Sequence, residues 1–249
     1  MMGSSNERPM DSRLRGNDTY GKVGSTLIAT ERNMITNEKS PAVKEMRYAV
    51  LPDRMPAIPP DKMTDAQKKV AAEIAAGPRG KVEGPYWPIL RSPGFAHSVQ
   101  GVGAYFRYHC PLDRRINEMA ALIAARSWSQ QFEWDVHILQ ALGAGLKPAV
   151  AEAIAEGRRP DGMAEDEEIL HDFVAELLAN KGVSDPTYAK TVATFGESGV
   201  IDILGIVGYY TMLAMIMNVG RTSLLEGRLL PLDPTPLHLR SLDSNPLRT

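Results

Sequence analysis

Apolar residues recur at helical spacing along most of the chain. Residues 115–128 show the pattern clearly, because Ile116, Met119, Leu122 and Ile123 fall on one face of a helix. No segment alternates apolar and polar residues with a period of two for long enough to form a strand. The pattern therefore predicts an all-α protein, with a single compact multi-helix domain and extended proline-rich arms.

Capping and terminating residues divide the chain into roughly eight helices. Thr64 is the expected N-cap of the first helix and Gly77 its end, and Pro148 fits the first turn of a later helix. Ser127 followed by Gln130 has the pattern of a capping box and predicts a helix start near residue 128. The expected helices span residues 64–77, 94–110, 115–128, 128–143, 148–157, 167–182, 184–196 and 199–220.

Changes in composition along the chain predict three regions. Residues 1–45 are polar and rich in Gly, Ser and Asn, which predicts a disordered N-terminal extension. The helical domain is expected to cover residues 46–232, and residues 233–249 to form an extended C-terminal tail. Within the domain, the loop 77–94 holds four Gly and four Pro. Together with the charged loop 157–166, it is expected to shape a binding pocket.

Charge and cysteine content argue against several classes of function. The 249 residues carry a net charge of −2 and contain no block of Lys or Arg, so we expect neither nucleic acid nor a membrane surface as a partner. Cys110 is the single cysteine, which excludes an intramolecular disulfide and a Cys-x-x-Cys redox centre. The expected location is a reducing cytoplasm.

Residues 199–220 form an apolar segment that is as long as a membrane span. However, Asp202 and Asn218 are polar, and Tyr209 and Tyr210 lie in the middle of the segment rather than at its ends. We therefore expect a buried helix of a globular domain, with a membrane span as the alternative.

The stretch "QFEWDVHILQALGAGL" (131–146) concentrates the candidate chemistry. Glu133 and His137 are four residues apart and share a helix face, as in a general acid or base that a carboxylate orients. Such pairs are common on solvated surfaces, but the apolar neighbours of this pair favour a buried helix. Glu118, on the preceding helix, is a further candidate for the same site. A metal site is disfavoured, because no second His has a suitable spacing.

Residues 117–154 resemble the core of the carboxymuconolactone decarboxylase-like family, which includes the alkylhydroperoxidase D proteins. The redox-active members of that family carry a Glu followed, after a fixed gap, by Cys-x-x-Cys-x-x-x-His. Glu118 and His137 match this motif, whereas Gln130 and Glu133 stand in place of the two cysteines. A weaker likeness extends through most of the helical domain.

This resemblance implies an alkylhydroperoxidase D-like fold and a cofactor-free carboxy-lyase of aromatic compound catabolism, with a small anionic lactone or ring acid as its substrate. In the family's decarboxylases, CO₂ leaves a carboxylated lactone whose own carbonyl accepts the charge, so no cofactor and no metal are implied. His137 would return a proton to carbon, with Glu133 or Glu118 setting its orientation. Family members also form homo-oligomers, often trimers or hexamers, and this chain is expected to do the same.

An anionic substrate needs a cation to bind it, and a guanidinium group suits a carboxylate. Arg126, beside the expected cap, is the first candidate and Arg107 is the second, and either could instead form a structural ion pair. Candidates for the pocket wall are Trp134 together with Tyr86, Trp87 or Tyr210, with core packing as the alternative for each.

Two other functions stay open. Many family members are thiol-dependent, peroxiredoxin-type alkylhydroperoxidases, but Gln130 and Glu133 can neither attack a peroxide nor resolve a sulfenic acid. Cys110 lies outside the motif and has no second cysteine with which to act. The third hypothesis is a non-catalytic homo-oligomer that binds a ligand.

Overall fold

In the computed structural model, the described residues, 52–224 and Leu232, form helices and no strand, which confirms the all-α prediction. Eight α-helices lie in this part of the chain. The elements are η2 (Pro60–Lys62, a 3-10 turn), α2 (Asp65–Ala76), α3 (Tyr86–Ile89), α4 (Pro93–Ala104), η3 (Tyr105–His109, a π-helix), α5 (Arg114–Ser127), α6 (Gln131–Gly143), α7 (Pro148–Ala155), α8 (Glu165–Asn180) and α9 (Asp185–Gly220). The predicted disorder of residues 1–45 and the predicted tail 233–249 fall outside the described residues.

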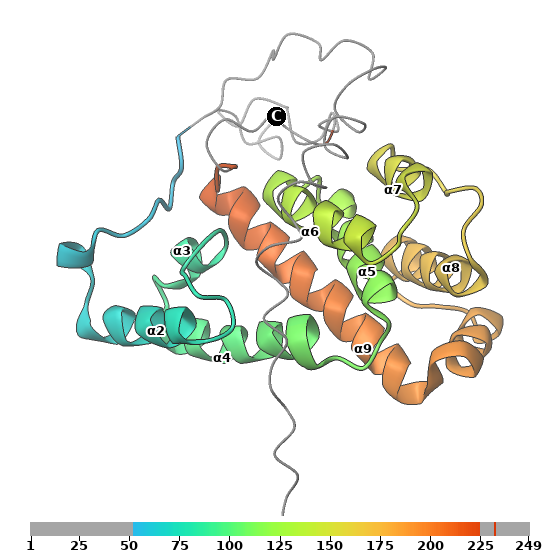
Figure 1. Cartoon of the computed structure of the whole chain (residues 1–249), viewed down its shortest axis with the longest axis horizontal. Coiled ribbons are helices and arrows are strands. Elements are labelled where there is room, and N and C mark those ends of the chain that lie inside the picture. The colour runs from blue at the N-terminus through green and yellow to red at the C-terminus, as the bar shows by residue number, and fades with distance from the viewer. Residues whose placement is uncertain (1–51, 225–231, 233–249) are drawn as a thin grey trace, which may run out of the picture. The chain divides into compact units, whose positions relative to one another are not determined.

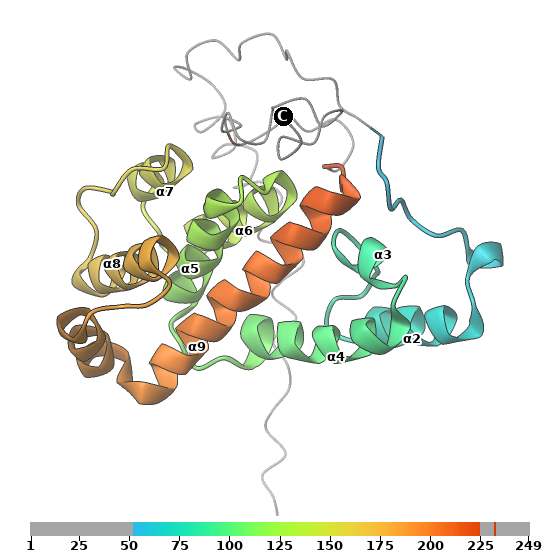
Figure 2. The same ribbon diagram turned by 180° about the vertical axis from the view of Figure 1, so that it is seen from behind.

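Helix α5 packs against several other helices. It packs against α6, α7, α8 and α9, and Figures 1 and 2 show α9 running obliquely across α5 and α6. Helix α2 packs on α4, and α3 contacts both α4 and α9. Helix α9 therefore contacts elements from both the first and the second half of the helical region.

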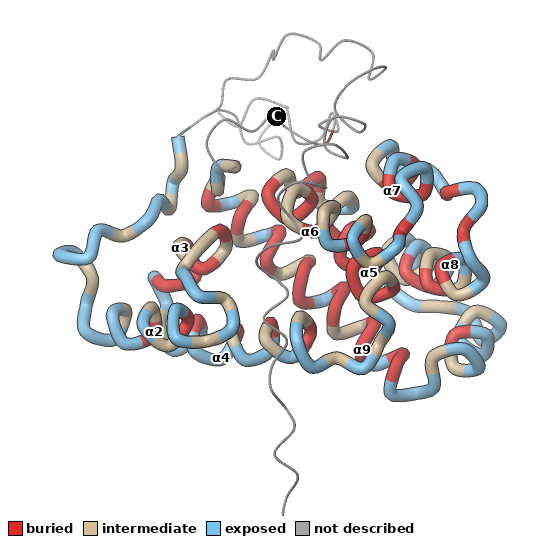
Figure 3. The backbone as a smooth tube through the Cα atoms, viewed as in Figure 1, coloured by how far each residue is buried: buried red, intermediate tan, exposed pale blue. Residues whose placement is uncertain are grey.

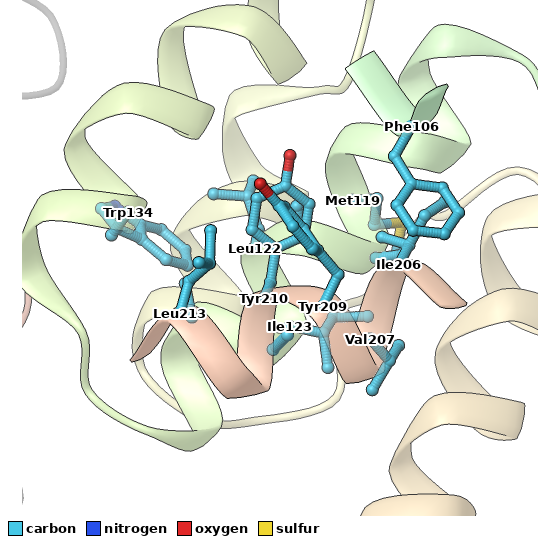
Figure 4. Close-up of a cluster of buried hydrophobic side chains, with 14 of the residues drawn as sticks. Phe106, Met119, Leu122, Ile123, Trp134, Ile206, Val207, Tyr209, Tyr210 and Leu213 are labelled. Atoms are coloured by element: carbon cyan, nitrogen blue, oxygen red, sulfur yellow. The ribbon is translucent and has the colours of Figure 1, made fainter. Parts of the chain in front are cut away.

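The hydrophobic core lies mainly between α5 and α9. Every residue from Ile116 to Ala125 is buried, and Figure 3 shows buried positions concentrated along these helices. Figure 4 shows Ile206 and Leu213 of α9 in one cluster with Leu122 and Ile123 of α5. The alanines of α5 are small enough to let neighbouring helices approach closely.

Helix α9 is long and apolar enough to cross a membrane, judged by length and composition. Of its most apolar window, 56% is buried inside the described protein. Tyr209, Tyr210 and Met217 are buried, whereas Ile201 and Val219 are exposed. The expected burial is therefore found on one face of this helix and not all around it.

Several predicted helix ends are confirmed. The Thr64 hydroxyl accepts a hydrogen bond from Gln67 N at 3.3 Å, and Thr64 N donates to Gln67 Oε1 at 2.9 Å, which completes a capping box. Pro148 is the first residue of α7, and Gly157 follows that helix with φ of 73°. Gly196 has φ of 70° and a non-helical backbone inside α9, so the predicted helix end there is confirmed, and α9 consists of two helical segments that meet at this kink.

Two boundaries near the pocket differ from the prediction. A short helix, α3, lies inside the predicted loop 77–94. Helix α6 begins at Gln131 rather than near residue 128, because Ser127 belongs to the last turn of α5 and its hydroxyl donates to the carbonyl of Ala124 at 2.7 Å. The N-cap of α6 is Gln130, and glutamine is not one of the residue types usually found at an N-cap.

Candidate active site

A cavity of about 140 Å³ lies between the loop after α2, the π-helix η3, and helices α6 and α9. Its lining comes from residues 79–86, 107–108, 132–137 and 209–213. The predicted contribution of loop 77–94 to a pocket is confirmed, whereas loop 157–166 does not line this cavity. The cavity therefore collects side chains from four segments that are far apart in the sequence.

The first turn of α6 is held in place by Gln130. Its Oε1 accepts hydrogen bonds from the backbone N–H groups of Phe132 at 2.6 Å and Glu133 at 3.2 Å. Its Nε2 donates to Asn218 Oδ1 at 3.0 Å, and Asn218 Nδ2 donates to Trp128 O at 3.0 Å. Gln130 thus caps α6 and ties it to α9, which fixes the position of Glu133.

His137 pairs with Glu118 rather than with Glu133. Its Nδ1 lies 2.6 Å from Glu118 Oε2, and both side chains are buried. Arg114 Nη2 lies 2.5 Å from the other carboxylate oxygen, Glu118 Oε1. Because Glu118 engages Nδ1, Nε2 is the ring nitrogen that is left for a molecule in the cavity.

The surroundings of Glu118 favour its ionised form. Burial alone raises the pKa of Glu118, but His137, Arg114 and Arg107 outweigh burial and hold the pKa below its ordinary value of 4.5. The carboxylate is therefore charged at neutral pH and accepts the Nδ1 proton of His137. This arrangement orients the ring as a general acid or base requires.

Glu133 lines the cavity but has no hydrogen-bond partner. It is 3% exposed, and among the described residues no group bonds either of its carboxyl oxygens. Burial raises the pKa of Glu133 well above 4.5. The side chain is therefore a neutral carboxylic acid over a range of pH in which an exposed glutamate is ionised.

Replacing Glu133 by glutamine is expected to change how stability depends on pH. Because the folded pKa is raised, the folded state holds a proton that the unfolded chain releases, and stability falls as pH rises from about 4.5 to the folded pKa. The amide does not titrate, so the variant should gain stability relative to wild type as pH increases over this window. Urea denaturation between pH 4 and pH 8 measures the difference. Glu197→Gln, an exposed control, should show no such trend.

Aromatic rings form one wall of the cavity. The His137 and Tyr210 rings meet edge to face with centroids 4.5 Å apart, and Tyr210 meets Tyr209 in the same way at 5.1 Å. The hydroxyls of Tyr209 and Tyr86 are hydrogen-bonded at 3.0 Å. Figure 4 shows Tyr209 and Tyr210 extending from α9. Tyr210, predicted as a wall residue, thus lies directly against His137.

Two guanidinium groups reach the cavity. Arg107 is carried by the π-helix η3, and its Nε is buried without a hydrogen-bond partner. Arg79, in the loop after α2, lies over the Tyr86 ring at 4.6 Å, and its Nη2 is also buried without a partner. Among the described residues, neither forms an ion pair. Arg107 was predicted from the sequence, but Arg79 was not. The one sequence feature that could have indicated Arg79 is its position in a loop that was expected to line a pocket.

Arg126 and Trp134, also predicted as substrate contacts, do not line this cavity. Arg126 lies eight residues beyond Glu118, about 12 Å farther along α5, where its Nη1 donates to Ser129 Oγ at 2.8 Å. Trp134 follows Glu133 by one position, which turns it about 100° away around α6, and Figure 4 shows it beside Leu213 in the core.

Cys110 is half-buried and does not line the cavity. Burial raises the pKa of its thiol, which lowers the fraction of reactive thiolate at neutral pH. Within residues 52–224, no group of three or more His, Cys, Asp or Glu side chains is arranged to hold a metal ion.

Comparisons with known proteins give a fold. No family profile matches the chain, and no curated protein matches it. One similar solved structure is a protein of unknown function from Agrobacterium tumefaciens, suggested to be the antioxidant defence protein AhpD. It is 19% identical, with 55% of this chain and 94% of that chain covered and a TM-score of 0.49.

A second similar structure is an alkylhydroperoxidase AhpD core, an uncharacterized peroxidase-related protein from Ralstonia eutropha JMP134. It is 14% identical, with 72% of this chain and 94% of that chain covered and a TM-score of 0.58. Likeness at this identity concerns the fold and not the activity. The described part of the chain therefore has the all-α fold of an alkylhydroperoxidase AhpD core.

Proposed function

We propose that this protein is a cofactor-free enzyme that acts on a small anionic lactone or ring acid, and specifically that it is a carboxy-lyase. The observation that carries the proposal is Glu133, a buried neutral acid with no partner, beside the His137–Glu118 pair. An unsatisfied buried polar group costs about 1–3 kcal/mol, so structural cores seldom retain one. A substrate oxygen that accepts the Glu133 proton in a hydrogen bond would satisfy it.

The cations of the cavity support an anionic substrate. Arg107 and Arg79 bring two guanidinium groups into the cavity without ion-pair partners among the described residues. A guanidinium donates to both oxygens of a carboxylate at once, which fixes the orientation of the bound group. We assign Arg107 to the reacting end, because its charge acts on Tyr210 and Glu118, the neighbours of His137.

The proposed reaction replaces the carboxyl group of the substrate by one proton, which His137 supplies and regains from water. The bond between the carboxyl carbon and the ring breaks, CO₂ leaves, and the electron pair moves into the lactone carbonyl. Glu133, as the neutral acid, donates a hydrogen bond to the growing oxyanion. His137 then delivers a proton from Nε2 to the ring carbon, and the Glu118 carboxylate balances the charge of its imidazolium form.

The test is a screen of carboxylated muconolactones and related carboxylated ring acids, which follows ultraviolet absorbance and CO₂ release together. We expect wild-type protein to release CO₂ from at least one of them without any added cofactor. A peroxide-consumption assay with added dithiothreitol runs in parallel and should give no turnover above buffer. No CO₂ from any compound would contradict the carboxy-lyase proposal, and peroxide turnover that depends on Cys110 would favour the hydroperoxidase instead.

A further inference from the structure

Arg79 lines the same cavity as His137 and lies against its aromatic wall. Its guanidinium lies over the Tyr86 ring, and the Tyr86 hydroxyl is bonded to that of Tyr209. The rings of Tyr209 and Tyr210 continue this series of contacts to His137. The charges of Arg79 and Arg107 both act on Tyr209, and the charge of Arg107 also acts on Glu118. The two guanidiniums therefore reach one cavity from different elements, Arg79 from the loop after α2 and Arg107 from the π-helix η3.

Gly103 of α4 makes room for the guanidinium of Arg79 and the hydroxyl of Tyr209. A Cβ atom at Gly103 would lie 2.4 Å from Arg79 Nη2 and 2.1 Å from the Tyr209 hydroxyl, far inside van der Waals contact. Gly103 is buried and its backbone is helical. Glycine is therefore needed here because a side chain would collide with these groups, and not because the backbone adopts an unusual angle. The guanidinium is thus seated in a specific place and is not a freely moving surface cation.

Charge in the cavity lining is unbalanced. Arg79, Lys81 and Arg107 are cations, and the ionised acid that faces them is Glu83, which pairs with Lys81 at 2.9 Å. Glu133 is neutral in this setting, and Glu118 is already engaged by His137 and Arg114. Two guanidinium charges are left without a counter-ion among the described residues. Partly desolvated cations are costly without an anion to pair with, so each guanidinium is a place for one anionic group.

We propose that Arg79 is a specificity-determining residue that binds a second anionic group of the ligand, so that the cavity selects small molecules with two anionic groups. The inference rests on the proposed function, which places the reacting group at Arg107 and His137, and it adds the residue that binds the other anionic group. Arg79 makes no contact with the reacting atoms in this assignment. It sets which molecules are held against Arg107 and His137.

The test compares benzoate with the three benzenedicarboxylates by isothermal titration calorimetry at pH 7, on wild type, Arg79→Met, Arg79→Lys and Arg158→Met. Wild type should bind at least one dicarboxylate about tenfold more tightly than benzoate, as a charged hydrogen-bonded contact provides. In Arg79→Met this ratio should fall to about one while benzoate affinity stays within about twofold. Arg79→Lys should keep part of the preference, and Arg158→Met, a surface charge paired with Glu156, should keep all of it.

Other outcomes overturn the assignment. If wild type binds no dicarboxylate more tightly than benzoate, or binds none of the four compounds, the cavity has no site for a second anionic group. A preference that persists in Arg79→Met, or an equal loss for benzoate and dicarboxylates, removes Arg79 as its source. Unchanged benzoate affinity shows that a variant is folded. A dicarboxylate preference without any CO₂ release in the screen would support the role of Arg79 and contradict the carboxy-lyase proposal. CO₂ release without such a preference would support the carboxy-lyase proposal and contradict the role of Arg79.

Discussion

Replacing Glu118 by alanine is expected to lower the free energy of unfolding by about 3–5 kcal/mol. Glu118 is 1% exposed and its carboxylate holds both His137 Nδ1 and Arg114 Nη2. Arg114 is 38% exposed and can be solvated by water, but the buried His137 ring loses its partner, and breaking a buried pair costs far more than losing a surface pair. Urea denaturation at pH 7 measures the change.

A matched control for this change is Glu73→Ala, since Glu73 pairs with His97 at 2.8 Å on the surface. Exposed pairs contribute about 0–1 kcal/mol, so the control should lose no more than that. Equal losses for Glu118→Ala and Glu73→Ala would contradict the buried network.

The contribution of Glu118 should also depend on pH. Its pKa is lowered in the folded protein, so the stabilisation is present above the unfolded value near 4.5 and is lost as pH falls through the folded pKa. The stability difference between wild type and Glu118→Ala should therefore shrink as pH falls from about 4.5 through the folded pKa of Glu118.

Replacing His137 by alanine is expected to lower kcat by about 10²–10⁴-fold, the usual contribution of a positioned acid or base. The substrate for this measurement is any compound that the screen shows to release CO₂. The effect on KM should be smaller, because the guanidiniums and not the imidazole hold the anion in the proposed mechanism.

The control is His97→Ala, which removes a histidine that also bonds a glutamate but is solvent-exposed. It should leave kcat unchanged. A His137→Ala protein that is folded and keeps wild-type kcat would contradict the acid role, and would move the protein towards the non-catalytic, ligand-binding hypothesis.

The sequence named residues of α5 and α6 that the structure brings together, but it could not choose the partner of His137. Spacing along α6 suggested Glu133, because residues four apart share a face. The structure pairs His137 with Glu118 instead, and that choice depends on how α5 and α6 pack. Periodicity describes a single helix and carries no information about the neighbour that faces it. The consequence is large, because Glu133 is then left unpaired and neutral.

The cationic part of the cavity was the least predictable. Arg79 lies in a loop rich in Gly and Pro, where no period assigns a direction to a side chain. Arg107 lies in a π-helix, and that extra residue per turn shifts the face that a regular helix would present. Arg126 was predicted because it is close in sequence to the cap of α6, but that closeness does not bring it near Glu118. The predicted homo-oligomer and cytoplasmic location remain predictions.

The proposed mechanism requires Glu133 to be a neutral acid in the cavity, and the titration of this carboxyl group can be followed without a substrate. Protein labelled with ¹³C at glutamate carboxyl groups gives one NMR resonance for each side chain, and Glu133→Gln identifies the resonance of Glu133. We predict that this resonance keeps its protonated shift well above pH 4.5, after the exposed glutamates have ionised. A Glu133 carboxyl that titrates together with the exposed glutamates would contradict the neutral acid and the proton-donor site that is built on it.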